Sequence, residues 1–141
     1  MIAYDNRSDS SYDLALLKRI SDSLSKRDIE LILTNNDEIR DINARHRGID
    51  KATDVLSFPS LATAKHSPLG SIVISDDYVK AAAKRYGHDA QDEFALLFIH
   101  GLLHLLGFDH ENDQGEMRRK EEQLIQKYAL PKSLIIRTQE E

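Results

Sequence analysis

The sequence predicts an α+β fold, a single domain in which several helices pack on a small mixed β-sheet. Apolar, strand-like segments alternate with amphipathic helical segments along the chain. The length of 141 residues suits one core, so residues 1–141 are expected to form one unit. One helical segment, at about 90–106, is apolar on nearly every side, which is typical of a helix in the middle of a core.

The spacing of apolar residues predicts nine elements. In chain order, these are a strand at 1–5, a helix from Ser10 or Ser11 to about Ser25, a strand at 29–34, a helix from Asn35 or Asn36 to about His46, a strand at 53–58, a strand at 69–75, a helix from Asp76 or Asp77 to about Tyr86, a helix at 90–106 and a helix at 113–128. A period of two marks the strands, and spacings of three and four mark the helices. The polar segment at 60–68 predicts a loop.

The ends of the predicted helices carry residues suited to those positions. Serine or asparagine precedes the first two helices, and such side chains accept hydrogen bonds from the free N–H groups of a first turn. Gly48, Gly87 and Pro131 are expected to stop the second, third and last helices. The tail from about residue 131 is expected to be loosely ordered.

The composition limits the classes of protein to which the chain can belong. It has no cysteine, which excludes disulfides, thiolate metal sites and cysteine nucleophiles. The N-terminus has no signal-peptide pattern, and the longest apolar stretch, at 94–108, is too short to cross a bilayer. We therefore expect a soluble cytoplasmic protein without a membrane partner. The formal net charge of −5 disfavours a general nucleic-acid binder, although a local basic patch remains compatible with it.

Three of the six histidines lie within eleven residues. His100 and His104 are four residues apart on the predicted apolar helix, so both imidazoles leave the same side, one turn apart. Gly107 can end the helix and let the chain aim His110 at the same point. Three nitrogen ligands leave a fourth tetrahedral position for water, which is typical of catalytic zinc. The alternative, core histidines satisfied by backbone carbonyls, is less favoured for three histidines at this spacing.

The residue after the first of these histidines separates two kinds of hydrolase. The spacing equals that of the metzincin zinc peptidases, HExxHxxGxxH, but Gly101 stands where that motif has its glutamate general base. Glycine cannot accept a proton from water. A peptidase interpretation is therefore disfavoured, and a base or an electrostatic helper must come from elsewhere.

A second cluster is basic and precedes the strand at 53–58. Arg45, Arg47 and Lys51 could hold phosphates, or stabilise the charge that develops on a phosphoryl group during its transfer. The alternative is a solvated helix end, because cations suit helix C-termini. Beside a metal site, phosphate chemistry is the favoured interpretation.

Other polar residues near these motifs leave alternatives open. Asp109 could accept a hydrogen bond from a ligand histidine and so orient its ring, or it could cap the turn. Thr53 and Ser57 could line a cleft beside the metal. The run at 118–122, three cations followed by two glutamates, predicts a salt-paired surface.

Three segments together carry a resemblance to a known family. They are HGLLHLLGFDH at 100–110, RGIDKATDVLSFP at 47–59 and LGSIVIS at 69–75, with EIRDIN at 38–43 as a weaker element. The chain resembles the YbeY family, bacterial metal-dependent endoribonucleases of rRNA maturation. Two departures from the family pattern are Ser71, where aspartate is common, and Ala52, where proline is frequent.

The resemblance implies specific roles for residues of this chain. His100, His104 and His110 would be the ligands of one zinc ion per chain, and Arg47 would be the arginine near the metal that RNA cleavage needs. The substrate would be single-stranded RNA, mainly the 3′ end of small-subunit (16S) rRNA. Ribosome quality control would be the wider role, with the small subunit and ribosomal or GTPase proteins as partners.

Three functional hypotheses follow. The favoured one is a single-strand-specific, zinc-dependent endoribonuclease in which water is activated at the metal, Arg47 stabilises charge on the phosphoryl oxygens, and Arg45 and Lys51 hold neighbouring phosphates. The second is a zinc-dependent hydrolase of a peptide or small amide. The third is a ribosome-assembly factor in which zinc mainly stabilises the fold.

Overall fold

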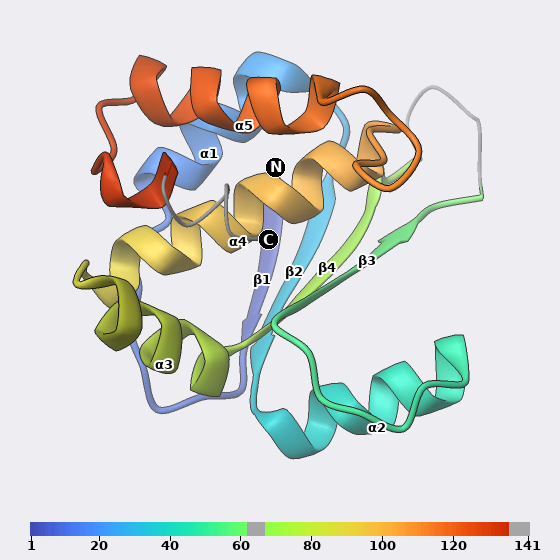
Figure 1. The fold of residues 1–141 in the computed structure, drawn as a ribbon. Coiled ribbons are helices and arrows are strands. Elements are labelled where there is room, and N and C mark those ends of the chain that lie inside the picture. The colour runs from blue at the N-terminus through green and yellow to red at the C-terminus, as the bar shows by residue number, and fades with distance from the viewer. Residues whose placement is uncertain (62–66, 136–141) are drawn as a thin grey trace.

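The computed structural model describes residues 1–61 and 67–135, in which helices cover both faces of a four-stranded sheet (Figure 1). The elements are β1 (Ile2–Asn6), α1 (Ala15–Leu24), β2 (Ile29–Thr34), α2 (Asn36–Arg47), β3 (Val55–Pro59), β4 (Gly70–Ser75), α3 (Asp76–Tyr86), α4 (Ala90–Leu105) and α5 (Glu116–Lys127). Within the described ranges, these match the nine predicted elements in type and order. Most of the predicted loop at 60–68 lies outside the described residues.

The sheet is mixed, as predicted. Its order is β1-β2-β4-β3, with β1, β2 and β4 parallel and β3 antiparallel to β4. Because successive side chains of a strand point to opposite faces, each strand serves two layers. The pair Ser57 and Ile72 faces α4, whereas the pair Leu56 and Val73 faces α2. The α+β class is therefore confirmed.

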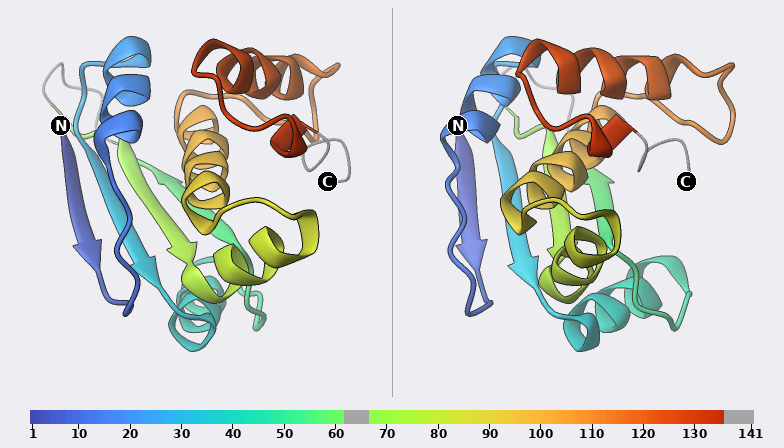
Figure 2. Two further views of the ribbon diagram at one scale, coloured as in Figure 1. Left: turned by 90° about the vertical axis from the view of Figure 1, so that its left-hand side faces the viewer. Right: turned by 60° about the vertical axis from the view of Figure 1, so that its left-hand side comes forward.

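Helix α4 is the centre of the molecule. It lies on one face of the sheet and is covered by α1, α3 and α5, whereas α2 lies against the other face (Figure 2). Eleven of its sixteen residues are buried, among them Phe94 and Phe98, which are fully buried. A helix with this environment needs apolar residues on every side, which is why its sequence has no polar stripe.

The first helix begins later than predicted. Helix α1 starts at Ala15 rather than at Ser10 or Ser11. The Ser10 hydroxyl donates a hydrogen bond to the Asp76 carboxylate at 2.5 Å, and the Tyr12 hydroxyl donates another at 2.6 Å. These long-range bonds hold the segment before α1 in a non-helical path. The side chain of Asp13 accepts a hydrogen bond from the Ala15 N–H instead.

The C-terminal segment packs more closely than the prediction of a loose tail implies. Leu134 is fully buried against Leu96 and Ile125, so the chain follows the core at least to that residue. Residues 136–141 lie outside the described part of the chain. The described helices include none that is long and apolar enough to cross a membrane.

Helix α4 makes its closest approach to the sheet at Gly101. A Cβ atom on this glycine would lie 2.8 Å from Ile72 Cγ2 and 3.2 Å from Ser57 Oγ. The Ser57 hydroxyl also donates a hydrogen bond to the Gly101 carbonyl at 3.1 Å. The absence of a side chain at this position therefore sets the distance between the helix and strands β3 and β4.

We expect Gly101→Ala to lower the free energy of unfolding by about 1–2 kcal/mol. Overpacking of a core costs about 1–3 kcal/mol, and the better helix propensity of alanine returns up to about 1 kcal/mol. Urea denaturation measures the change. Lys84→Ala, on the exposed surface of α3, is the control and should stay within about 0.5 kcal/mol of wild type. A Gly101→Ala variant as stable as wild type would mean that α4 has room to shift.

Candidate metal centre

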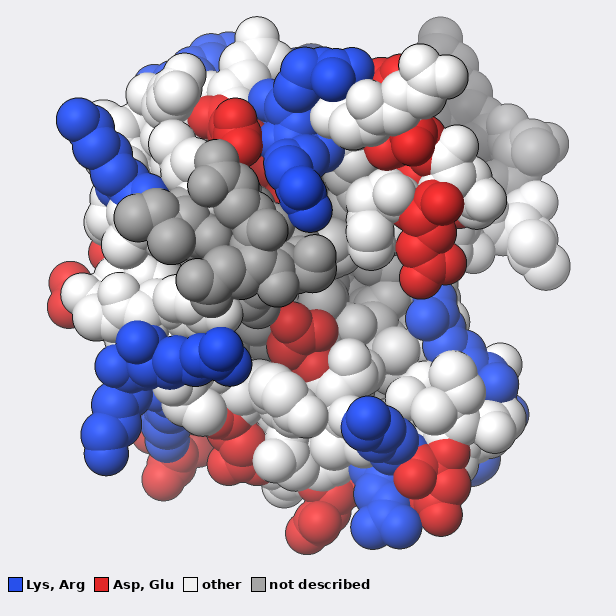
Figure 3. Space-filling view, viewed as in Figure 1, with Lys and Arg blue, Asp and Glu red and all other residues white. Residues whose placement is uncertain are grey.

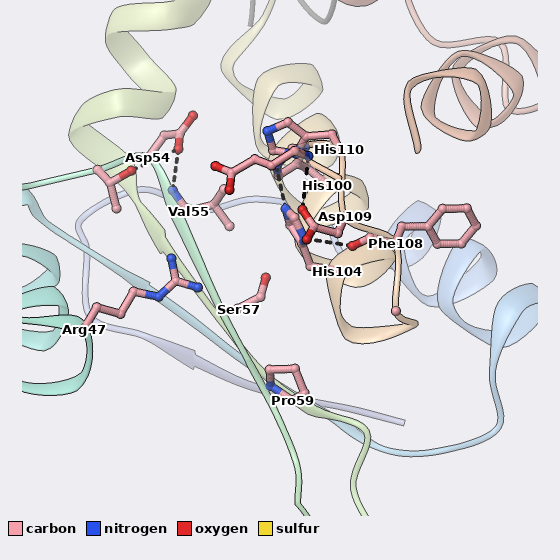
Figure 4. A pocket seen from close by; sticks show the side chains of 13 residues that line it. Arg47, Asp54, Val55, Ser57, Pro59, His100, His104, Phe108, Asp109 and His110 are labelled. Carbon is pink, nitrogen blue, oxygen red and sulfur yellow. Dashed lines mark hydrogen bonds between the residues drawn. The ribbon is translucent and has the colours of Figure 1, made fainter. Parts of the chain in front are cut away.

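The three clustered histidines line a cavity of about 540 Å³ beside the free edge of the sheet (Figure 4). Its walls come from β3, from the end of α4 and from the loop that follows α4. The side chains of Ser57 and Thr53 line this cavity, as the sequence suggested. Because β3 is an edge strand, the C-terminus of α2 can reach the same cavity from the other side of the sheet.

His100 and His104 present their Nε2 atoms to a common point. The two atoms are 3.2 Å apart, and the rings meet edge to face. Two ligand nitrogens that each lie about 2.0–2.1 Å from a tetrahedral ion are separated by about 3.3 Å. The pair is therefore spaced as two ligands of one metal ion would be.

His110 reaches the pair because the chain reverses after α4. Gly107 has φ of +100°, a conformation that L side chains rarely adopt, and its N–H donates to the His104 carbonyl at 3.0 Å. The His110 ring then lies 5.4 Å from His100 and 5.5 Å from His104, between ring centroids. One nitrogen of each histidine falls within 4.8 Å of the others, so the three could hold a metal ion.

The other ring nitrogens fix the proton positions. His100 Nδ1 lies 2.6 Å from a Glu121 oxygen, and His104 Nδ1 lies 3.0 Å from the Phe108 carbonyl. Both partners are acceptors, so each Nδ1 is assigned the N–H and each Nε2 keeps a lone pair directed at the shared point. Burial, and next the charge of His100, lower the pKa of His104, which favours the neutral form that binds metals.

Glu121 is the functional candidate that the sequence interpretation missed. Its carboxylate is buried and accepts the hydrogen bond of His100, whereas the run at 118–122 had predicted an exposed, salt-paired surface. That prediction is wrong for this residue. The burial of Glu121 could have been predicted from helical spacing. The inner face of α5 consists of Met117, Glu121, Leu124 and Ile125. A glutamate on an apolar face needs a partner.

Asp109 has hydrogen bonds of the turn-capping kind. Its carboxylate accepts from the Glu111 N–H at 3.1 Å and from the Asn112 amide at 2.5 Å. The bond from Asn112, followed by that from Glu111, lowers the pKa of Asp109 below its usual range. The bonds that orient His100 and His104 come instead from Glu121 and from the Phe108 carbonyl. Of the two interpretations left open for Asp109, these contacts support the cap.

The three predicted cations are separated by the structure. Arg47, the last residue of α2, extends toward the cavity of the histidines (Figure 4) and also lines a second cavity of about 420 Å³. Lys51 lines only the second of these cavities. Arg45 lines neither, and its guanidinium lies 3.5 Å from the Asp41 carboxylate. Figure 3 shows basic and acidic side chains interspersed on one face of the molecule.

Ser71 and Ala52, the two departures from the family pattern, do not line the histidine cavity. Ser71 points to the sheet face opposite α4, where its hydroxyl donates to a Glu30 oxygen at 2.9 Å. Ala52 lines the second cavity and packs near Ile39. Neither residue contributes to the wall around the histidines.

Comparison with known proteins gives a consistent result. A family model described as Endoribonuclease YbeY matches residues 7–129. Proteins named Endoribonuclease YbeY from Wolinella succinogenes and Sulfurimonas denitrificans are 56% and 54% identical to the chain, each comparison covering 99% of both sequences. The solution structure of the Thermotoga maritima protein TM1509 is 25% identical, with a TM-score of 0.57 over 92% of both chains.

Glu121→Gln should weaken the binding of a metal ion at the three histidines by about 10–100-fold, measured with added Zn²⁺, while the fold is retained. Glutamine keeps the size and an acceptor oxygen but removes the negative charge that strengthens His100 as a ligand, and loss of such partners typically has this effect. Competition with a chromophoric chelator measures the affinity. Glu122→Gln, the same change at the next residue of α5, is the matched control and should bind like wild type. Equal affinities in the two variants would contradict a role of Glu121 at His100.

Proposed function

The chain belongs to the YbeY family of endoribonucleases, and from this premise we propose that it is a zinc-dependent endoribonuclease of single-stranded RNA. The observation that carries the proposal is the shared cavity, in which Arg47 and three converging imidazoles line opposite sides of one space. A phosphodiester carries in its ground state the negative charge that a guanidinium recognises, whereas a peptide bond or a small amide is neutral there.

His100, His104 and His110 are the proposed ligands of a single zinc ion. The donor set fits zinc, because three neutral imidazoles with an open approach are typical of its catalytic sites. Zinc bound there supplies Lewis acidity and a nucleophile from water at neutral pH. Glu121 holds the His100 ring and its tautomer, and the Phe108 carbonyl does the same for His104.

Arg47 is the proposed catalytic cation. Its five N–H donors can contact two phosphate oxygens at once, and it has no ion-pair partner among the described residues, so it needs to break none to bind substrate. In the transition state, charge develops on these oxygens, and a positioned donor stabilises that charge more than the charge of the ground state. Lys51 would hold a neighbouring phosphate, whereas Arg45 would contact RNA only outside the two cavities.

The fold opposes the peptidase alternative. A glutamate at position 101 would direct its side chain into Ile72 and Ser57, so the general base of the metzincin motif has no room here. An assembly factor with a structural zinc is the remaining alternative. It assigns no chemistry to Arg47, and cleavage assays on Arg47 variants therefore separate it from the proposed nuclease.

The biological setting is proposed on family membership alone. We propose small-subunit rRNA as the substrate, with cleavage near its 3′ end, and a role in ribosome quality control in the cytoplasm. A chain with a net charge of −5 gains little RNA affinity from its overall field. The proposal therefore includes ribosomal or GTPase proteins that bring enzyme and RNA together.

Cleavage of a defined single-stranded RNA by variants tests the proposal. Arg47→Ala should retain zinc but lower kcat by about 100–1000-fold, the usual cost of one transition-state donor. His110→Ala should lose both zinc and cleavage. Arg85→Ala removes the same charge from the last turn of α3, lines neither cavity, and should cleave like wild type.

Metal content is measured on each purified variant, because it separates loss of chemistry from loss of the ion. Equal residual cleavage by wild type, Arg47→Ala and His110→Ala would identify a contaminating nuclease and refute the enzyme proposal. Zinc retained by Arg47→Ala together with full cleavage would refute the role of Arg47.

A further inference from the structure

A second cavity adjoins the one that holds the histidines. It measures about 420 Å³ and lies between the end of α2, the segment that leads into β3, and the first turn of α3. Four residues line both cavities: Arg47, Thr53, Asp54 and Val55. A ligand bound at Arg47 can therefore extend into either space. The second cavity is large enough for one nucleoside-sized group.

Exposed apolar side chains form one wall of the second cavity. Among the described residues, four large hydrophobic side chains are exposed, and two of them, Ile49 and Tyr78, line this one cavity. Tyr78 is 37% exposed, and its hydroxyl is 3.5 Å from the Ala52 carbonyl. Exposed apolar groups gathered around a concave site mark a place where a ligand binds.

The polar wall complements the apolar one. Arg47 and Lys51 both line the cavity, and within the described ranges neither has an ion-pair partner. Asn43 also lines it, is 4% exposed and donates its side-chain N–H to the Lys51 carbonyl at 2.9 Å, which fixes the segment that carries the lysine. The cavity thus combines an aromatic ring, that of Tyr78, with two cations and one carboxylate, that of Asp54.

We propose that this second cavity is a nucleoside subsite, which holds the nucleotide next to the scissile phosphate with its base against the ring of Tyr78. This inference rests on the proposed endoribonuclease function. A phosphate at Arg47 lies at the boundary of the two cavities, so the nucleosides on its two sides occupy different spaces.

A base-stacking subsite at Tyr78 would also explain why the enzyme prefers single-stranded RNA. A base can lie against an aromatic ring only after it has left its neighbours in a helix. Stacking on an aromatic ring is worth about 1–3 kcal/mol per base and tolerates every base identity, because each base has a π-face. Duplex RNA presents no free base face, so Tyr78 favours unpaired strands without selecting a sequence.

Cleavage kinetics on a fluorophore-labelled single-stranded RNA test the subsite. Tyr78→Ala should lower kcat/KM by about 5–150-fold, mainly through KM, because stacking binds substrate and transition state alike. Tyr78→Phe keeps the ring and should recover most of the loss. Tyr86→Ala, which removes a tyrosine from the other end of α3 and lines neither cavity, should behave like wild type. Tyr78 lies outside the buried core clusters, so its truncation should leave thermal unfolding nearly unchanged.

A series of RNAs with one abasic position each locates the contact. For wild type, one position next to the cleavage site should show a penalty that is absent for Tyr78→Ala. The same penalty in both proteins at every position, or equal kcat/KM for wild type and Tyr78→Ala, would overturn the subsite while leaving the nuclease intact. Failure of wild type to cleave any RNA would overturn the proposed function, and the subsite with it.

Discussion

Two imidazoles on the most buried helix of the fold impose the main constraint on this structure. His100 and His104 point their Nε2 lone pairs at one place from 3.2 Å apart, and burial disfavours the extra proton that could bridge them. A metal ion satisfies both lone pairs without charging either ring. Helix α4 must therefore stay in register with the loop that supplies His110 and with the helix that supplies Glu121. Most of the core keeps this helix in place.

Local patterns predicted the parts of the fold that depend on neighbours in sequence. The periodicity of α4, the cap at Asn35 and the chain reversal at Gly107 are all short-range, and the structure has each of them. The start of α1 was missed because it depends on Asp76, more than 60 residues away. Glu121 was missed for a related reason. Its charge was assigned from adjacent residues, whereas its burial follows from residues one helical turn away.

Gly101 shows how one position can affect both packing and chemistry. In the sequence, this glycine shows only that the glutamate base of the metzincin motif is absent. In the structure it also brings α4 against Ile72 and Ser57, so a side chain could return at that position only if the helix moved away from the sheet. Such a movement would shift His100 and His104 relative to the wall that carries Thr53 and Ser57. The glycine at position 101 is therefore the cause of both the close packing and the absence of the peptidase base. Any charge that develops during a reaction in this cavity would have to be stabilised by a cation from another element.

The protein has a net charge of −5 and RNA is also negative, so overall attraction cannot bring them together. The position of Arg47 resolves this apparent conflict. Long-range attraction is screened within about 8–10 Å at physiological salt, so the charges that matter are those that touch the phosphates. Arg47 reaches the histidine cavity from the far side of the sheet only because β3 is an edge strand with no neighbour to block it. A fifth strand beside β3 would close that route and separate the guanidinium from the three histidines. The mixed sheet order thus allows Arg47 and the three histidines to line one cavity.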